Sequence, residues 1–397
     1  MKRFFTKLKA VSPGDLLHIF KLLLAVIPAV FLKKKRKNMW LVCEYENEAR
    51  DNGYWFFKYL RENHPEQDAV YAISGKSADY YKVKDLGETV EYGSLKHWIY
   101  YLAAEINISS QKGGKPNAAV CYLLEVYSVL KNKRVFLQHG ITKDLADLFF
   151  YENTKMRLFI CGAQPEYDFV REKFGYPQGW VAYTGFARFD YLLEPYPQKK
   201  QLLISPTWRA YLRSASSDPY KSGSNEGIMQ SEYYKTWTSL LLNERFQSIC
   251  DKYGYEVKFF PHRNTAHCFD EISGLTEKIK IANWEEYDLQ LLMKESSLMI
   301  TDYTSSAMDF AYMEKPVIYY QFDYDEYRKG HLATGYFDYE RDGFGEVVRD
   351  EDALIDLAEA YMRGEYTAEK YKSRIDGFFP LRDKNNCKRI YEAVKKI

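Results

Sequence analysis

Hydrophobic and polar positions along the chain fall into two alternating patterns. Short runs rich in Val, Ile, Leu and aromatic residues are followed by longer stretches in which apolar residues recur every three or four positions. The runs predict strands, the stretches predict amphipathic helices, and their regular succession predicts βαβ units around a parallel sheet. In the first part of the chain the pattern predicts strands at 39–45, 69–74, 88–92, 105–109, 134–140, 158–162 and 180–185, with helices at 52–63, 94–104 and 118–130.

A second series of the same kind begins after Pro195 and Pro197, which predict a linker. Residues 211–232 are rich in Ser, Gly, Asn and Asp and predict a mobile insertion. The stretch 351–397 at the end of the chain is predicted to be helical. The other predicted elements of this series are strands at 201–208, 256–262, 278–283, 297–302 and 315–321, and a helix at 233–253.

The two series predict an α/β protein with two Rossmann-type, doubly wound domains. A chain of 397 residues is too long for one ordinary hydrophobic core, which agrees with two domains. We expect a basic segment at 1–38, a first domain at 39–196 and a second domain at 197–397, with the last helix free to pack back on the first domain. Ligands of such folds bind at the carboxyl ends of the strands, so we expect the domains to face each other across a cleft.

Residues 1–38 combine many basic residues with one apolar segment. The first 40 residues hold ten Lys and Arg against one acid, Asp15, although the net charge of the whole chain is only +1. The uninterrupted apolar run, Leu22–Leu32, has 11 residues, whereas a membrane span needs about 20. We therefore expect a helix that lies in the membrane interface, with Lys33–Lys37 on anionic lipid headgroups. An ordinary core helix with a solvated basic tail and a true span are the alternatives.

The composition of the chain argues against several classes of protein. A basic head on an acidic body is not typical of a nucleic-acid-binding protein. The six cysteines are scattered, without the spacing of a zinc site, and predict reduced thiols in the cytosol. The sequence contains neither a P-loop nor the nucleophile elbow of an α/β-hydrolase. We expect no cofactor and no metal, and we assign the acidic pair Asp323 and Asp325 to packing and a loop.

Polar clusters fall at the ends of four predicted strands, where a cleft-facing site requires them. His139 is the candidate general base, since imidazole can remove a proton from a polyol or sugar hydroxyl near neutral pH. Arg209 can hold a phosphate with its planar guanidinium, and His262 can stabilise charge on a leaving group. The alternatives are a structural histidine for His139 and an exposed salt bridge for Arg209.

The fourth cluster, residues 302–306, follows a predicted strand and opens a helix that ends near Met313. Thr304, Ser305 and Ser306 turn the chain there, so that free backbone N–H groups and the helix dipole face the cleft. That arrangement suits a diphosphate, with a plain Ser N-cap as the alternative.

Taken together, these segments resemble the CDP-glycerol glycerophosphotransferase family, whose members assemble teichoic acids and related capsules. The longest matching segment is the most specific, and the shorter ones occur in the right order along the chain. The segments are FLQHGITKD (136–144), YTGFARFD (183–190), ISPTWR (204–209), FFPHRN (259–264), MITDYTSSAMDFAYMEKPVIYYQFDYDEY (299–327) and TGYFDYERDGFGEVV (334–348).

The resemblance implies a GT-B-like pair of Rossmann-type domains with an amphipathic N-terminal membrane attachment. It also implies inverting, metal-independent transfer of a polyol phosphate from a CDP-polyol donor, with release of CMP. The expected acceptor is a lipid-linked teichoic acid or capsule precursor at the cytoplasmic face of a bacterial membrane. By motif, His139 is similar to an acceptor-side base and His262 to a donor-diphosphate contact. Ser305 and Ser306 are similar to phosphate-binding residues at a helix N-terminus.

Asp302 and Asp309 belong to the same signature. The sequence departs from the family's pattern at three places: Phe344-Gly345-Glu346 replaces a Pro-Gly-Pro-like turn, Arg263 stands where Pro is frequent, and Gly-Ile-Thr follows His139 where Gly-Thr is usual. These departures leave open whether the polyol is glycerol or ribitol and whether one unit or many are added.

There are two competing hypotheses. One is a GT-B glycosyltransferase with a UDP- or GDP-sugar donor, and the other is a non-catalytic membrane-bound binding protein. A homo-oligomer is compatible with the sequence.

Overall fold

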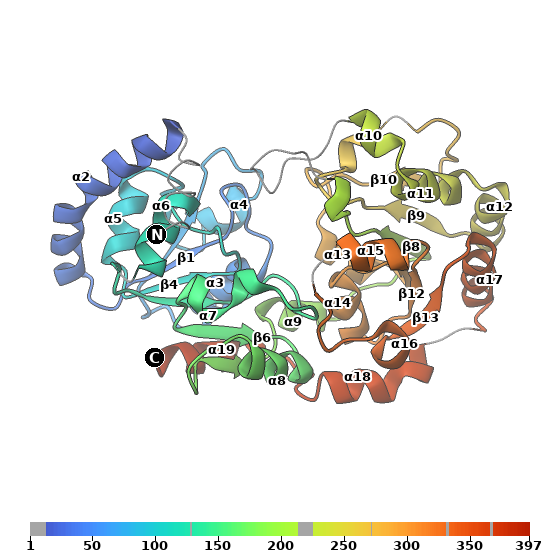
Figure 1. Cartoon of the computed structure of the whole chain (residues 1–397). Helices are drawn as coiled ribbons and strands as arrows, with labels where there is room; N and C mark the ends of the chain where they lie inside the picture. The colour runs from blue at the N-terminus through green and yellow to red at the C-terminus, as the bar shows by residue number, and fades with distance from the viewer. Residues whose placement is uncertain (1–12, 128, 213–224, 271, 331–332, 366–367) are drawn as a thin grey trace. The chain divides into compact units, whose positions relative to one another are not determined.

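The strands form two parallel sheets, one in each of the two units into which the chain divides (Figure 1). The computed structural model describes residues 13–127, 129–212, 225–270, 272–330, 333–365 and 368–397. The first unit is drawn from residues 1–141, 146–193 and 380–397, and the second from 142–145 and 194–379. The basic residues before Pro13 and most of the predicted insertion at 211–232 lie outside the described residues.

The sheet of the first unit has the strand order β3-β2-β1-β4-β5-β6-β7, and its pairings are parallel. Chain order reverses between β1 and β4, as in a Rossmann fold, so the carboxyl ends of these two strands form the switch point where such folds bind ligands. The strands are β1 Trp40–Cys43, β2 Ala69–Ile73, β3 Thr89–Glu91, β4 Ile106–Ser109, β5 Lys133–Phe136, β6 Leu158–Cys161 and β7 Val181–Tyr183.

Three helices of the first unit, α3, α5 and α6, begin at residues whose side chains cap them. The side chain of Ser94 accepts a hydrogen bond from the backbone of His97 at the start of α5, and Asn117 does the same for Val120 at the start of α6. The helices are α2 Pro13–Lys35, α3 Asn52–Asn63, α4 Tyr80–Lys84, α5 Leu95–Ala103, α6 Ala118–Val126, η1 Asp147–Phe149, α7 Tyr151–Thr154, α8 Gln164–Lys173, α9 Ala187–Leu192 and α19 Asn386–Lys395.

The helix α2 packs along the first unit through one face and exposes the opposite face. Ala25 and Ala29 are buried, whereas ten large apolar side chains between Leu16 and Phe31 are exposed. The helix has 23 residues and is longer than the apolar run Leu22–Leu32, and Pro28 lies inside it without ending it. By length and composition alone, Gly14–Lys35 could cross a membrane. Hydrogen bonds join α2 to its neighbours, from Lys21 Nζ to the carbonyl of Gly93 (2.7 Å), from Trp98 Nε1 to His18 Nδ1 (3.1 Å) and from Asn117 Nδ2 to Asp15 Oδ1 (2.8 Å).

The sheet of the second unit has the order β10-β9-β8-β11-β12-β13, again with parallel pairings. Its chain order reverses between β8 and β11, which repeats the Rossmann order of the first unit. The prediction of two doubly wound α/β units is therefore confirmed. The strands are β8 Gln201–Ser205, β9 Glu256–Phe259, β10 Ile279–Ile281, β11 Leu298–Thr301, β12 Val317–Tyr320 and β13 Gly345–Val348.

The helices of the second unit pack against a core that contains Trp237, Phe246, Phe259 and Leu354. The helical elements are η2 Ala210–Leu212, α10 Asn225–Met229, α11 Glu232–Leu242, α12 Glu244–Tyr253, η3 Ala266–Cys268, α13 Leu289–Glu295, α14 Ser306–Tyr312, α15 Tyr324–Gly330, α16 Tyr339–Asp342, α17 Glu351–Met362, η4 Ala368–Tyr371 and α18 Lys372–Phe378.

Three of the predicted helices are wrong in length, and the first of them, predicted at 118–130, ends at Val126 as α6. The single helix predicted at 233–253 is two helices, α11 and α12, because Asn243 leaves the helical backbone and its side chain caps α12. The stretch 351–397 is interrupted after α17 by Gly364, whose φ is +80°, and continues as η4, α18 and α19. The strand β13 was not among the predicted elements, because its short sequence begins with a glycine that weakens strand propensity.

Candidate active site

The first part of the candidate site is the loop that follows β5. Gln138 has φ +61°, a left-handed backbone that is strained for any residue other than glycine. Asn52, at the start of α3, holds this loop because its Nδ2 donates to the carbonyls of Leu137 (3.3 Å) and Gln138 (2.6 Å). Gln138 Oε1 in turn accepts a hydrogen bond from the backbone N–H of His139 (3.2 Å). His139 lies at the carboxyl end of the sheet with part of its surface exposed, although protein surrounds its ring.

Asn52 also connects this loop to α9. Its Oδ1 accepts a hydrogen bond from the backbone N–H of Arg188 (3.1 Å), and Arg188 Nη1 pairs with Asp51 Oδ1 at 2.9 Å. Asn52 and Arg188 are buried. The network therefore fixes the backbone of His139 from two helices and brings a positive charge close to it.

Protein surroundings keep the imidazole of His139 neutral. Desolvation by the surrounding protein and the charge of Arg188 lower the pKa of His139 to about 4, against a weaker opposing hydrogen bond to the backbone of Ser110. A neutral imidazole can accept a proton, so the group is in the form that a general base requires at pH 7. A phosphate placed beside the ring would raise this pKa towards the range in which a base works best.

In the second unit, Asp302 joins the ends of β8 and β11 at the switch point. Its Oδ1 accepts hydrogen bonds from the backbone N–H groups of Thr207 (2.8 Å) and Tyr303 (2.5 Å). Its Oδ2 pairs with Arg209 Nη1 at 2.8 Å. Through these bonds the Asp302 carboxylate, which is completely buried, holds the two loops together.

Arg209 is completely buried and its guanidinium is shared between two carboxylates. Nε and Nη2 donate to Asp323 at 2.6 and 3.0 Å, in addition to the pair with Asp302. The alternative of an exposed salt bridge is therefore wrong, and a direct contact between Arg209 and a phosphate stays a prediction. Four aromatic rings lie 5.0 to 5.7 Å from the central carbon of the guanidinium, those of Tyr233, Tyr303, Phe322 and Tyr327.

The predicted phosphate-binding residues lie at the start of α14. Thr304, Ser305 and Ser306 are partly exposed, and the hydroxyl oxygens of Thr304 and Ser306 are 3.0 Å apart. Ser305 occupies the N-cap position, but its side chain makes no capping hydrogen bond, so a plain Ser cap does not explain it. Asp309 lies further along α14 and is buried.

The imidazole of His262, after β9, has one nitrogen occupied. Its Nδ1 accepts a hydrogen bond from the backbone N–H of Asn264 (3.2 Å), so in the neutral ring Nε2 carries the proton and is a donor. Burial and the charge of Arg263 lower the pKa of His262 to about 4, which keeps the ring neutral at pH 7. The ring of Trp208 lies 5.8 Å from that of His262 and connects it to the loop that carries Arg209.

The structure thus brings Arg209 and Asp302 into contact and places Thr304 and Ser306 together, all in the second unit with His262, Ser305 and Asp309. His139 belongs to the first unit. Among the described residues, no group of three or more His, Cys, Asp and Glu side chains could hold a metal ion.

Several residues of the two constellations were not predicted from the sequence. Asn52 and Asp51 open a helix 86 residues before the loop that they support, and nothing local marks that role. Arg188 lies inside a segment that the resemblance quoted, but its contact with Asp51 needs the fold. Asp323 had been assigned to packing, and its D-Y-D spacing was the available signal for the pair with Arg209.

Comparison with known protein families assigns residues 24–396 to one family model, described as CDP-glycerol:poly(glycerophosphate) glycerophosphotransferase. The chain is 32% identical over 393 residues to the minor teichoic acid biosynthesis protein GgaB of Bacillus subtilis (strain 168), a match that covers 95% of this chain and 42% of GgaB. It is 22% identical to the teichoic acid poly(glycerol phosphate) polymerase of Bacillus spizizenii, covering 85% of this chain and 86% of that protein. The chain therefore spans less than half the length of GgaB.

Solved structures share the fold at low sequence identity. The wall teichoic acid polymerase TagF matches with a TM-score of 0.65 at 15% identity, over 96% of this chain and 96% of the TagF chain. MnaA of S. aureus, in a co-structure with UDP, matches with a TM-score of 0.57 at 12% identity, over 90% of this chain and 96% of the other. These matches confirm the predicted GT-B-like fold class.

Proposed function

The chain belongs to the CDP-glycerol:poly(glycerophosphate) glycerophosphotransferase family, and from this premise we propose that it transfers a polyol phosphate from a CDP-polyol to a lipid-linked teichoic acid or capsule precursor. The observation that carries the proposal is the family match over residues 24–396, within which two neutral histidines stand at strand ends. The named relatives take part in teichoic acid assembly, which supports this class of acceptor.

In the proposed reaction, His139 removes the proton from a hydroxyl group of the acceptor. The hydroxyl oxygen then bonds to the phosphorus that carries the polyol, and the bond from that phosphorus to the bridging oxygen of CMP breaks. The products are the extended acceptor, CMP and the proton held by His139. Negative charge grows on the departing CMP, and the Nε2–H of His262 is suited to stabilise it.

The second unit is proposed to hold the donor. The hydroxyls of Thr304, Ser305 and Ser306 are accessible and can donate to the diphosphate oxygens. Asp302, two residues before Thr304, and Arg209 keep the β8 and β11 loops together, which supports a positioning role for both. Asp309 is proposed to support the same helix from its buried side.

We also propose that α2 attaches the protein peripherally to the cytoplasmic face of the membrane. Its exposed apolar side chains include Leu23 (66%) and Ile27 (70%), and the exposed Lys33–Lys35 follow them. One face of α2 packs on the first unit, which supports a position along the interface better than a span. Glycerol or ribitol phosphate, and one unit or many, are both compatible with these features.

The test is a donor panel with the purified protein. CDP-glycerol, CDP-ribitol, UDP-sugars and GDP-sugars are each incubated with a lipid-linked disaccharide acceptor, with EDTA present, and nucleotide release is measured. We expect CMP from one CDP-polyol, which would name the polyol and show that no metal is needed. Release of UDP or GDP instead would support the alternative GT-B glycosyltransferase and overturn the proposal.

A further inference from the structure

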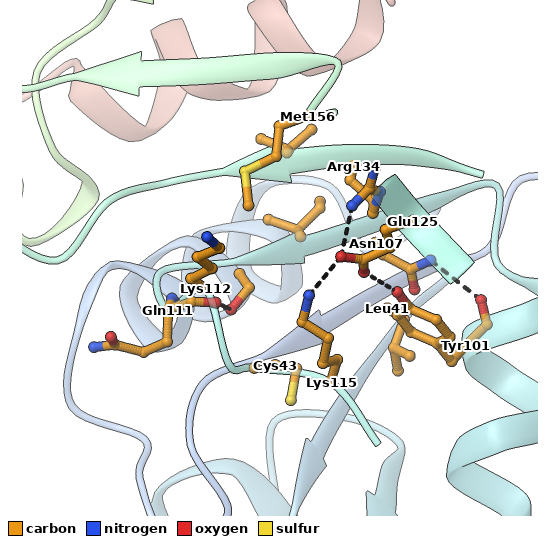
Figure 2. Close-up of a pocket in the computed structure, with 14 residues that line it drawn as sticks. Leu41, Cys43, Tyr101, Asn107, Gln111, Lys112, Lys115, Glu125, Arg134 and Met156 are labelled. Carbon is orange, nitrogen blue, oxygen red and sulfur yellow. Dashed lines mark hydrogen bonds and ion pairs between the residues drawn. The ribbon is translucent and has the colours of Figure 1, made fainter. Parts of the chain in front are cut away.

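A small pocket lies in the first unit, beside the loop that follows β4 (Figure 2). Its walls come from β1, α5, β4, the loop after β4, α6 and β5, together with Met156 before β6. The cavity has a volume of about 30 Å³. Since a buried water needs roughly 10–15 Å³, it has room for two or three waters or one phosphate-sized group, but not for a nucleoside.

Two cations and one carboxylate form the polar wall of this pocket. Lys115 Nζ and Arg134 Nη1 lie 2.6 and 2.7 Å from the same oxygen, Oε2 of Glu125, and the hydroxyl of Tyr101 donates to the other carboxylate oxygen (Figure 2). Lys115, Arg134 and Glu125 are 6%, 8% and 4% exposed. The cluster therefore buries one positive charge in excess, which is unfavourable unless an anion compensates it.

The pocket also contains polar atoms with no hydrogen-bond partner among the described residues. Asn107 Oδ1 receives no donor, and Arg134 Nη1, although it lies 2.7 Å from Glu125 Oε2, makes an ion pair there without a well-directed hydrogen bond. Buried polar atoms are rarely left unpaired, so each marks a place for a water or a ligand atom. Asn107 Oδ1 can accept from a donor such as a hydroxyl, and the excess positive charge of Lys115 and Arg134 favours an anion such as a phosphate.

The position of the pocket connects it to the candidate base. The backbone of Ser110, in the loop after β4, raises the pKa of His139, and the next residues of the same loop, Gln111 and Lys112, line the pocket. A Cβ on Gly114 would lie 2.8 Å from the carbonyl oxygen of Cys43, so this loop crosses directly over the end of β1. The pocket therefore adjoins the switch point between β1 and β4, where Rossmann-type folds bind ligands.

We propose that this pocket binds the phosphate group of a polyol phosphate, with Arg134 and Lys115 on the phosphate oxygens and Asn107 on a hydroxyl. The phosphate is that of the acceptor, next to the hydroxyl that His139 activates. This assignment to the acceptor rests on the proposed function, whereas the anion site itself does not.

The test uses two substitutions that change the charge of the pocket in opposite directions. Isothermal titration measures the binding of sn-glycerol 3-phosphate, a monoester, and of glycerophosphoglycerol, a diester, to the full-length protein without nucleotide. Arg134→Gln removes a cation and should weaken binding about tenfold or more, since hydrogen bonds to charged groups are the strong ones. Glu125→Gln removes the competing carboxylate and should tighten binding. Structural damage alone would weaken binding in both variants.

The matched control is Lys133→Gln, the neighbour of Arg134 on β5, which pairs with Glu105 instead. It should bind like the unsubstituted protein, and circular dichroism checks that each variant is folded. If Arg134→Gln fails to fold, tighter phosphate binding by Glu125→Gln is sufficient to test the site.

Equal binding by all variants, or no saturable binding, would overturn the site. Binding of the monoester alone would overturn its assignment to the acceptor. Phosphate binding without CMP release from any donor would overturn the proposed function and leave the site standing.

Discussion

Asp144, five residues after His139, accepts a hydrogen bond at its Oδ1 from Arg328 Nη1 (3.0 Å). The backbone N–H of Leu145 donates to the carbonyl of Ala333 (2.9 Å) beside this pair. Residues 142–145 are therefore built into the second unit, although His139 belongs to the first. His139 therefore lies three residues before a segment that belongs to the second unit.

Loss of the Asp144–Arg328 pair should affect turnover more than donor affinity. Burial opposes ionisation, but Lys143 and Arg328 still hold the pKa of Asp144 below its usual value, so the pair is charged at pH 7. In Arg328→Gln we expect kcat to fall about 10- to 100-fold, as for a misplacement of a catalytic group by about 1 Å, with KM for the donor nearly unchanged. Arg328→Lys should restore part of the rate. Equal effects on kcat and KM would argue against a positioning role.

The His139 side chain should account for most of the chemical step. His139→Ala should reduce turnover roughly 10²- to 10⁴-fold, the usual contribution of a general base, while donor binding measured by titration stays intact. Since the lowered pKa keeps the ring of the free enzyme neutral down to about pH 4, kcat/KM of the unsubstituted protein should hold from pH 7 to about pH 5. Below that, protonation should remove the base and the rate should fall. A kcat/KM that already falls through pH 6.5 would contradict the pKa shift of the free enzyme, and an unchanged rate in His139→Ala would exclude the role.

The Arg209 cluster should contribute mainly to stability. Removing one partner of a buried ion pair leaves an uncompensated charge, so Arg209→Met or Asp323→Asn should lower the free energy of unfolding by about 3–5 kcal/mol. Denaturant titration measures this effect. The control Arg341→Met removes an exposed pair with Asp342 and should change stability by less than about 1 kcal/mol. If the Arg209 variant is as stable as the control, the guanidinium is better explained as a ligand contact.

The sequence predicted those elements whose limits are set by local signals. The helix predicted at 52–63 has the bounds of α3, because Asp51 caps it and its apolar residues Phe56, Phe57 and Leu60 keep a helical period. The break at Asn243 was missed because apolar residues continue with the same period on both sides of it. Period alone does not distinguish one helix from two that pack on the same core.

Only those site residues that lie at the end of a predicted strand could be recognised from the sequence. A histidine or serine at a strand end can be recognised locally, because parallel strands present their carboxyl ends at one edge. The partners of these residues cannot, since Arg209 and Asp323 are 114 positions apart and Asn52 and Gln138 are 86 apart. Such pairs depend on the order of the strands in the sheet, and that order cannot be read from a single sequence.

A buried histidine should make the first unit sensitive to acid. Burial, with a smaller effect of His18, lowers the pKa of His97 to about 3, whereas in the unfolded chain it is near 6.5. Between these values the unfolded state binds the extra proton, so stability falls as pH decreases from about 6.5 to about 3, by at most about 1.4 kcal/mol per pH unit. In His97→Asn the amide oxygen can accept the Gly93 N–H bond that Nδ1 accepts, and this slope should flatten. Thermal unfolding at several pH values, with His64→Asn as control, checks it, and equal slopes would contradict the expectation.

Membrane attachment by α2 should depend on its apolar face and its lysines separately. Leu23→Glu with Ile27→Glu alters two exposed side chains on the face away from α5, so the fold should survive while binding to vesicles is lost. Replacing Lys33, Lys34 and Lys35 by Gln should weaken binding to anionic vesicles about a hundredfold, at about 1 kcal/mol per basic residue, and leave binding to neutral vesicles unaffected.

Arg36 is a matched control, because its side chain pairs with Glu88 at 2.8 Å. Its replacement by Gln should change vesicle binding little. Flotation with vesicles of both compositions measures all three. Release of the unsubstituted protein by alkaline carbonate would distinguish an interfacial helix from a span, since a spanning helix is retained, and retention would therefore contradict the interfacial position.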